Sequence, residues 1–301
     1  MEIKIVITKK NKDTVLKLID ELVEAEAISL STEEKEAQFI LSSPPEPAAV
    51  LRQGPKIEAL HVGEPNITKS VFGTWGMFNS YIPGKAALRV LTHLVSNSGG
   101  KSIEYNRFMD KCIAVFRDVR LSRYRGFPKK ASDSAKQRLS MHLIWPYSQI
   151  GLIQIYGEKD TQFVTITKEG LEFANLPNPL LDYGQEQQIL SEEESRWLLD
   201  HLRKIDELGF KEFSTLKSLV TFLALGHKRF EDIVNWFKNN KEFVDWVNAR
   251  SRYKDNPRAF YRQLHNISTT FASGKIALLR ELGIISTSRA KYQVLGNRGL
   301  T

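Results

Sequence analysis

One pattern occurs twice in the sequence, about 132 residues apart, and it constrains the fold more than any other feature. Each copy contains the end of an apolar helix, a glycine followed by two apolar residues, a polar turn, and a run of alternating apolar residues; the copies cover residues 145–171 and 279–300. Alternation with a period of two is typical of a half-buried strand. Gly151 and Gly283 let the chain reverse after each helix, because glycine can take a positive φ. Each copy therefore predicts a helix, a strand, a turn and a second strand.

This order of elements resembles the back half of a winged-helix domain. In that family the pattern marks the end of the third helix, the first wing strand, the wing and the second wing strand. The resemblance covers residues 83–180 and 190–301. Two features depart from the family pattern: Trp145-Pro146 is expected to break the third helix late, and residues 190–250 hold more helices than a winged helix needs, as a separate bundle or an elaboration. An αββ unit in an unrelated α+β fold is the alternative interpretation.

The chain is predicted to be an α+β protein with a small N-terminal α/β domain over residues 1–65, followed by two winged-helix-like, mainly helical domains over 66–182 and 183–301. The boundary between residues 182 and 183 is placed within the stretch 176–184, because its Pro and Gly residues interrupt regular structure. Residues 63–84 are rich in Gly, Pro and Asn but also in aromatic residues. We expect them to form an irregular segment packed onto a neighbouring domain.

Helical periodicity and capping residues predict most of the helices. The expected helices cover about residues 83–98, 103–117, 133–145, 213–225, 229–238, 241–250 and 274–282, with one more opened by a capping box of Ser191 and Glu194 and one by Asn256-Pro257. On the helix opened by Asn256-Pro257, one face is apolar and Arg258 and Arg262 lie on the opposite face. Phe260, Leu264 and Ile267 are expected to face the core.

Basic residues are concentrated in two blocks. Residues 117–138 carry a net charge of +6 and residues 250–298 carry +8, whereas residues 1–60 carry −3. Clustered Lys and Arg side chains on a near-neutral body indicate a protein that binds a polyanion. The alternative is that these side chains only make two surfaces soluble and bind no partner.

The resemblance implies that the third helix enters the major groove and that the wing contacts the adjacent backbone. The basic blocks lie before or around the two proposed third helices, so contacts to phosphates are expected from both. The candidate nucleic-acid-binding residues are Arg117, Arg120, Arg123, Arg125, Lys129, Lys130, Lys136, Arg138, Arg250, Arg252, Lys254, Arg258, Arg262, Lys275, Arg289 and Lys291. The aromatic residues among them, which either stack on bases or pack in the core, are Tyr124, Phe127, Tyr253 and Tyr261.

No catalytic residue, cofactor site or metal site is predicted. The sequence contains neither a G-x-x-x-x-G-K-[ST] loop nor a G-x-G-x-x-G motif, so nucleotide hydrolysis and dinucleotide binding have no support. The six histidines are scattered, and the single cysteine, Cys112, is expected in the core. A metal-dependent nuclease would need an acidic residue and a nearby acid-x-Lys pair on adjacent strands; the nearest candidates, at 33–35 and 158–160, look like solvated turns.

These observations predict a non-enzymatic protein that binds nucleic acid, in the first place double-stranded DNA, with a role such as transcription regulation. Two alternatives stay open: a subunit of a larger nucleoprotein or defence complex whose wings bind protein, and a nuclease whose site the sequence does not show. The aromatic residues around Trp236 and Trp246 could form bundle core or a partner groove, and a homodimer is compatible with the sequence. No membrane partner is expected, because no long apolar stretch and no secretory signal are present. A cytoplasmic or nucleoid location is expected.

Overall fold

The computed structural model divides the chain into two compact units, Met1–Ser43 and Pro44–Thr301. The residues that the structure describes are 51, 63, 67, 69–74, 78, 80–124, 126–128, 132–158, 161–185, 189–226, 229–288 and 291–295. All of them belong to the second unit. The small α/β domain predicted for residues 1–65 therefore lies outside the described residues, except for positions 51 and 63.

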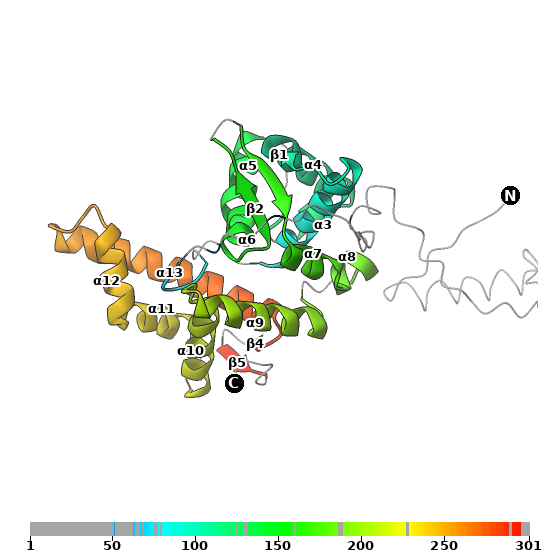
Figure 1. Ribbon diagram of the computed structural model, residues 1–301. Helices are drawn as coiled ribbons and strands as arrows, with labels where there is room; N and C mark the ends of the chain where they lie inside the picture. Colours follow the sequence, from blue (N-terminus) through cyan, green and yellow to red (C-terminus); the bar gives the residue numbers. More distant parts are fainter. Residues whose placement is uncertain are drawn as a thin grey trace, which may run out of the picture. The chain divides into compact units, whose positions relative to one another are not determined.

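The described part is mainly helical and contains two small antiparallel sheets, which confirms the predicted α+β class. Figure 1 shows the helices and strands of residues 82–183 grouped around one sheet, and those of residues 192–294 beside the other. We call these groups the first half and the second half. Their buried apolar side chains form a single cluster. The predicted domain boundary at residue 183 stays a prediction.

The first half carries the three-stranded sheet, whose order is β1-β3-β2 with antiparallel neighbours. Ile103 was expected on a helix but pairs with Val164, because the strand that it opens is too short to show alternation in the sequence. The elements are α3 (Ile82–Asn97), β1 (Ile103–Glu104), α4 (Tyr105–Asp118), a 3-10 turn (Leu121–Arg123), α5 (Asp133–Leu139), a π turn (Ser140–Ile144), α6 (Trp145–Gln149), β2 (Ile153–Tyr156), β3 (Phe163–Ile166), α7 (Lys168–Asn175) and α8 (Pro179–Tyr183).

The third helix of the first half passes through Pro146 without a break, so the expected interruption at Trp145-Pro146 is wrong. Ser132 caps its start by accepting a hydrogen bond from the N–H of Ala135. Proline has no N–H, and its ring crowds the carbonyl group four residues earlier. The π turn over Ser140–Ile144 lies directly before this position and widens the helix. The chain therefore stays helical from residue 133 to residue 149.

The second half begins with the predicted capping box of Ser191 and Glu194. Its elements are α9 (Glu192–Glu207), α10 (Glu212–Ala224), α11 (Phe230–Asn239), α12 (Lys241–Arg250), α13 (Pro257–Glu281), β4 (Ile285–Ser288) and β5 (Lys291–Val294). The expected start of a separate helix near residue 274 is wrong, because α13 is one helix of 25 residues. Thr269 and Thr270 donate to the carbonyl groups four residues earlier, which satisfies both hydroxyls inside the helix.

The repeated sequence pattern corresponds to two matching helix–hairpin connections. Gly151 and Gly283 have φ values of 76° and 68°, in the left-handed region that favours glycine. The next residue in each copy donates its N–H to a carbonyl group of the preceding helix, Leu152 to Tyr147 and Ile284 to Leu279, both at 2.9 Å. Antiparallel hairpins follow in both copies. The predicted helix, turn and strand pairs at these positions are confirmed.

Part of the irregular segment before α3, residues 69–74, packs onto the second half, whereas Phe78 packs on Tyr147 of the first half. Ser70 forms an isolated β-bridge with Phe210. The Phe72 ring meets the rings of Phe243 and Trp246 edge to face, with centroids 5.1 and 6.1 Å away. Such edge contacts are favourable for aromatic pairs. The chain therefore contributes to the core of the second half before it enters the first.

Candidate nucleic-acid interface

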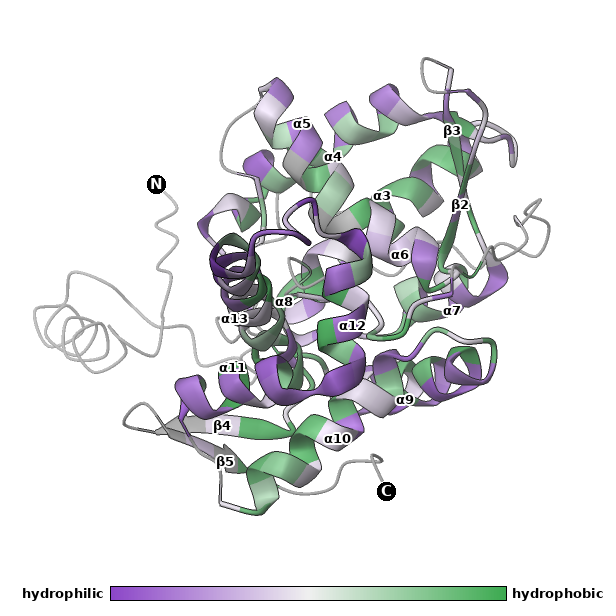
Figure 2. Ribbon diagram, turned by 90° about the vertical axis from the view of Figure 1, so that its left-hand side faces the viewer, coloured by the Kyte–Doolittle hydropathy of each residue, from purple (hydrophilic) through white to green (hydrophobic). Residues whose placement is uncertain are grey.

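The first part of the second basic block, residues 250–262, forms an exposed surface at the connection from α12 to α13. Asn256 caps α13 by accepting from the N–H of Ala259. Figure 2 shows this connection as mostly hydrophilic ribbon. Five cationic residues in this segment are exposed, and we call them the α12–α13 cations: Arg250, Arg252, Lys254, Arg258 and Arg262.

The orientation predicted for the start of α13 is confirmed. Leu264 is buried, and Phe260 and Ile267 are partly buried against the core. Arg258 and Arg262 lie one helical turn apart and are both exposed. The face of α13 that carries the arginines is therefore open to a ligand.

The α12–α13 cations are not neutralised within the described part of the chain, where none of them forms an ion pair with a carboxylate. Two of them lie on aromatic rings instead: the guanidinium of Arg250 is 4.7 Å from the Trp246 ring centre, and that of Arg252 is 4.9 Å from Tyr253. A ring contact orients a guanidinium but leaves its charge available to a phosphate.

Sequence reasoning missed Lys238, a sixth cation near this surface. Its ammonium donates to the hydroxyl of Tyr261 at 2.8 Å and lies 4.7 Å from the centre of that ring. Tyr261 itself is 58% exposed. Lys238 lies on α11, outside both charge runs, so only the packing of α11 against α13 brings it here.

The first basic block is exposed where α4 ends. Arg117, Arg120 and Arg123 are all exposed. Arg117 has a weak contact with Asp118 at 3.8 Å, and Arg123 lies over the Tyr124 ring and donates to its hydroxyl at 2.8 Å. Arg120 has a φ of 58°, a left-handed conformation that is rare for a residue with a side chain.

Lys136 is partly occupied by an acidic neighbour. Its ammonium lies 2.6 Å from the carboxylate of Asp110 on α4. This hydrogen bond raises the pKa of Lys136. A phosphate at this position would have to compete with Asp110, so Lys136 is a weaker candidate than the exposed arginines.

Lys275 does not belong to the candidate interface, which corrects the sequence-based expectation. Its side chain is 1% exposed, and its ammonium lies 2.7 Å from Oε2 of Glu212. It also donates to the carbonyl and the hydroxyl of Thr74, both at 3.0 Å. Burial lowers the pKa of Lys275, and Glu212 opposes that shift. This cation is a structural member of the core.

Six further candidates fall outside what can be placed. Arg125, Lys129, Lys130 and Arg289 lie outside the described residues, and the side chains of Arg138 on α5 and Lys291 on β5 are not described. Among the interleaved aromatic residues, Phe127 is core, with its ring centre 4.9 Å from that of Phe116.

The third helix of the first half has a different exposed face from α13. Met141 is 51% exposed and Trp145 is 53% exposed, one helical turn apart. Side chains of this size are usually covered, and paired exposed ones are typical of interaction surfaces. Sequence reasoning missed this face because the predicted helix ended near residue 145, whereas the helix continues to residue 149.

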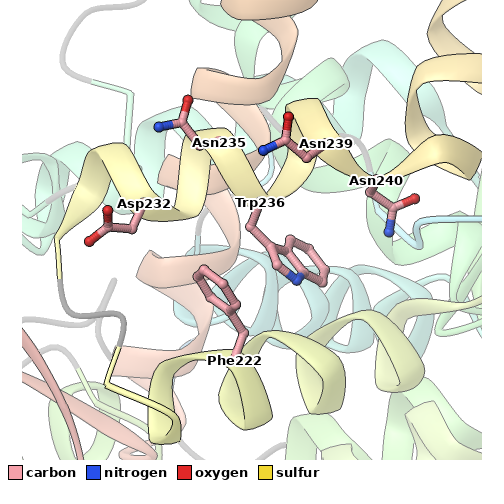
Figure 3. Close-up of a pocket in the computed structure, with 6 residues that line it drawn as sticks. All are labelled: Phe222, Asp232, Asn235, Trp236, Asn239 and Asn240. Carbon is pink, nitrogen blue, oxygen red and sulfur yellow. The ribbon is translucent and has the colours of Figure 1, made fainter.

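A shallow pocket of about 380 Å³ lies between α10 and α11. Figure 3 shows the Trp236 indole and the Phe222 ring facing one another, with centroids 5.9 Å apart. The pocket is also lined by Asp232, Asn235, Asn239 and Asn240. Trp236 is therefore half in the core and half at a polar surface, whereas Trp246 packs on Phe243 and Phe271.

The cysteine and the acidic stretches that the sequence offered as candidates for chemistry are either buried in the core or wholly or partly outside the described residues. Burial raises the pKa of the Cys112 thiol, as expected for a core cysteine. Among the described residues, no group of three or more His, Cys, Asp or Glu side chains could hold a metal ion. The acidic stretch 33–35 lies outside the described residues, as do positions 159 and 160. No helix in the described part has the length and apolarity to cross a membrane.

Comparisons with protein-family models, with curated proteins and with solved structures found no match to this chain.

Proposed function

We propose that the protein binds double-stranded DNA through two winged-helix-like units, and that the second unit makes the main contact. The observation that carries this proposal is the exposed, unneutralised set of α12–α13 cations, two of which lie on the outward face of α13. Arginine binds phosphate with two parallel N–H donors, so neighbouring guanidinium groups on one helix face can hold a DNA backbone.

The order of elements supports the winged-helix interpretation. In the first half α3, α4 and the helix over residues 133–149 precede the hairpin β2–β3, with β1 on the other side of β3. In the second half α9, α10 and α13 precede the hairpin β4–β5, and α11 and α12 are inserted before the third helix. The extra helices predicted for residues 190–250 are then an elaboration that supplies part of the basic surface.

A binding assay with three probes tests this proposal. Fluorescence anisotropy in low salt would compare random-sequence duplex DNA, single-stranded DNA and RNA, each as a labelled probe. We expect the duplex to bind most tightly, because helix α13 fits a groove whose two edges carry phosphates. Equal affinity for all three probes would favour general polyanion binding, and absence of duplex binding would remove DNA as the partner.

A second candidate function is protein binding within a larger complex, and the exposed pair Met141 and Trp145 favours it. In this case the first half would hold a protein while only the second half contacts DNA. Replacing both side chains by Gln would then abolish partner binding and leave duplex affinity unchanged. Loss of duplex affinity in the same variant would place this helix face at the DNA instead.

A further inference from the structure

The third helix of the second half is joined at its end to the first helix of the first half. Glu281 is the last residue of α13, and its carboxylate accepts from the Ser80 hydroxyl at 2.6 Å, from the N–H of Ile82 at 3.1 Å and from the N–H of Tyr81. These N–H groups open α3, where a helix has unpaired donors and the positive end of its dipole. A buried carboxylate at this point therefore attaches α13 to α3.

A second attachment runs in the opposite direction. Ile150 follows α6 directly, and its carbonyl oxygen lies 2.6 Å from Nε2 of His201 on α9. The His201 ring also stacks on Trp197, with centroids 5.1 Å apart. Burial lowers the pKa of His201, so at neutral pH its ring is uncharged and Nε2 donates to the carbonyl group. The end of each third helix is thus attached to the first helix of the other half.

The two first helices are also joined to each other. Lys85 on α3 and Glu194 on α9 form an ion pair of 2.6 Å in which neither side chain is exposed. Asn178 donates to both carboxylate oxygens of Glu194, at 2.9 and 3.0 Å. Lys85 donates in addition to the carbonyl of Leu176 at 2.6 Å. The buried charges of Lys85 and Glu194 are therefore satisfied by hydrogen bonds when the two halves are placed as observed.

This network favours a single placement of the two halves. A small rotation would leave a buried carboxylate or ammonium without its partner, which is strongly unfavourable. A large separation would expose the apolar cluster that the halves share. The two third helices consequently keep a fixed spacing and orientation.

We propose that the duplex target is bipartite, with two contacted blocks of base pairs held at one fixed spacing. This inference rests on the proposed function. Half-site spacing reflects the separation of two recognition helices when the protein between them is stiff. Two units on a flexible connection would instead accept several spacings.

A selection experiment with the full chain tests the inference. The probe is a pool of duplexes with a random centre of about 40 base pairs, which covers several turns of about 10 base pairs. We expect two enriched blocks at one spacing, and an insertion of about five or about ten base pairs between them should lower affinity at least tenfold. Glu281→Gln removes one of the three attachments, so it should make that loss at least about threefold smaller. The exposed residue Glu192 on α9 offers a matched control, Glu192→Gln, which should keep the full loss.

Each other outcome has a defined meaning. One enriched block, duplex binding without an enriched sequence, or unchanged affinity after both insertions would overturn the fixed spacing while DNA binding stands. Absence of duplex binding in low salt would overturn the proposed function as well. Ser80→Ala removes one hydrogen bond and serves if Glu281→Gln does not fold. A spacing preference that is unchanged in the variants that fold would overturn the attachment through Glu281.

Discussion

The ammonium of Lys275 lies 2.7 Å from the carboxylate of Glu212, and both side chains are buried. Lys275→Ala should therefore destabilise the fold by about 3–5 kcal/mol, because it leaves Glu212 as an unpaired buried charge. Lys254→Ala, which removes an exposed cation, should change the free energy of unfolding by less than about 0.5 kcal/mol. Urea denaturation measures both. Similar, small effects of the two substitutions would contradict the assignment of Lys275 to the core.

Charge reversal on α13 separates binding from stability. Arg258→Glu combined with Arg262→Glu should lower duplex affinity at least about tenfold in low salt, or ~1.4 kcal/mol, because both side chains lie on the exposed face. The melting temperature should stay near that of the unchanged protein. Anisotropy titrations and thermal unfolding give the two quantities.

Two controls accompany this variant. Lys204→Glu with Lys217→Glu changes the net charge equally at exposed positions on α9 and α10, and should weaken binding much less. Phe260→Ala on the opposite face should cost on the order of 2 kcal/mol of stability instead. Equal losses of affinity in both charge-reversed variants would show that only total charge matters.

Arg120 allows a test in which stability and binding change in opposite directions. Its φ of 58° is unfavourable for a residue with a side chain by about 1 kcal/mol relative to glycine. Arg120→Gly should therefore stabilise the protein and weaken duplex binding, whereas Arg120→Ala should weaken binding without the gain in stability. Unchanged binding in both variants would mean that Arg120 does not contact a phosphate.

The carboxyl group of Glu281 predicts a pH dependence of stability. Burial raises its pKa from 4.5 to about 7, the hydrogen bonds from Ser80, Tyr81 and Ile82 oppose this, and Glu194 adds to it. A raised pKa means that the folded state keeps a proton that the unfolded chain releases. The stabilising contribution of this proton is complete below pH 4.5 and is lost as the pH rises through about 7.

The Glu281→Gln variant isolates that contribution, because two histidines also titrate: the partly buried His93 and the buried His201. Burial lowers the pKa values of His93 and His201, so these groups make stability rise with pH in a nearby range. The difference in unfolding free energy between the unchanged protein and Glu281→Gln cancels the histidine part. As the pH rises from 4.5 to about 7, we expect the unchanged protein to lose stability relative to Glu281→Gln. A difference that is constant with pH would contradict the raised pKa.

Local signals predicted much of the fold. The capping box of Ser191 and Glu194, the glycines at 151 and 283 and the alternating strands all act within a few residues, so their structural consequences are visible in the sequence. The exposed arginines of α13 follow from helical periodicity for the same reason.

Tertiary pairing explains what the sequence could not predict. Lys275 and Glu212 are 63 positions apart, and nothing local distinguishes a lysine that is buried in such a pair from one in solvent. The same holds for Lys85 and Glu194, which meet only because α3 packs near α9. The π turn before Pro146 was equally hidden, because proline usually ends a helix unless the turn before it widens.

The salt dependence of duplex binding tests the central claim most directly. If the five α12–α13 cations and the three exposed arginines near the end of α4 each neutralise a phosphate, the slope of log affinity against log salt concentration should be about −7, at about −0.9 for each phosphate. Removing the charges of Arg258 and Arg262 by change to Ser should make the slope less steep by about 2. A slope near zero, or no duplex binding in low salt, would contradict nucleic acid as the partner of these surfaces.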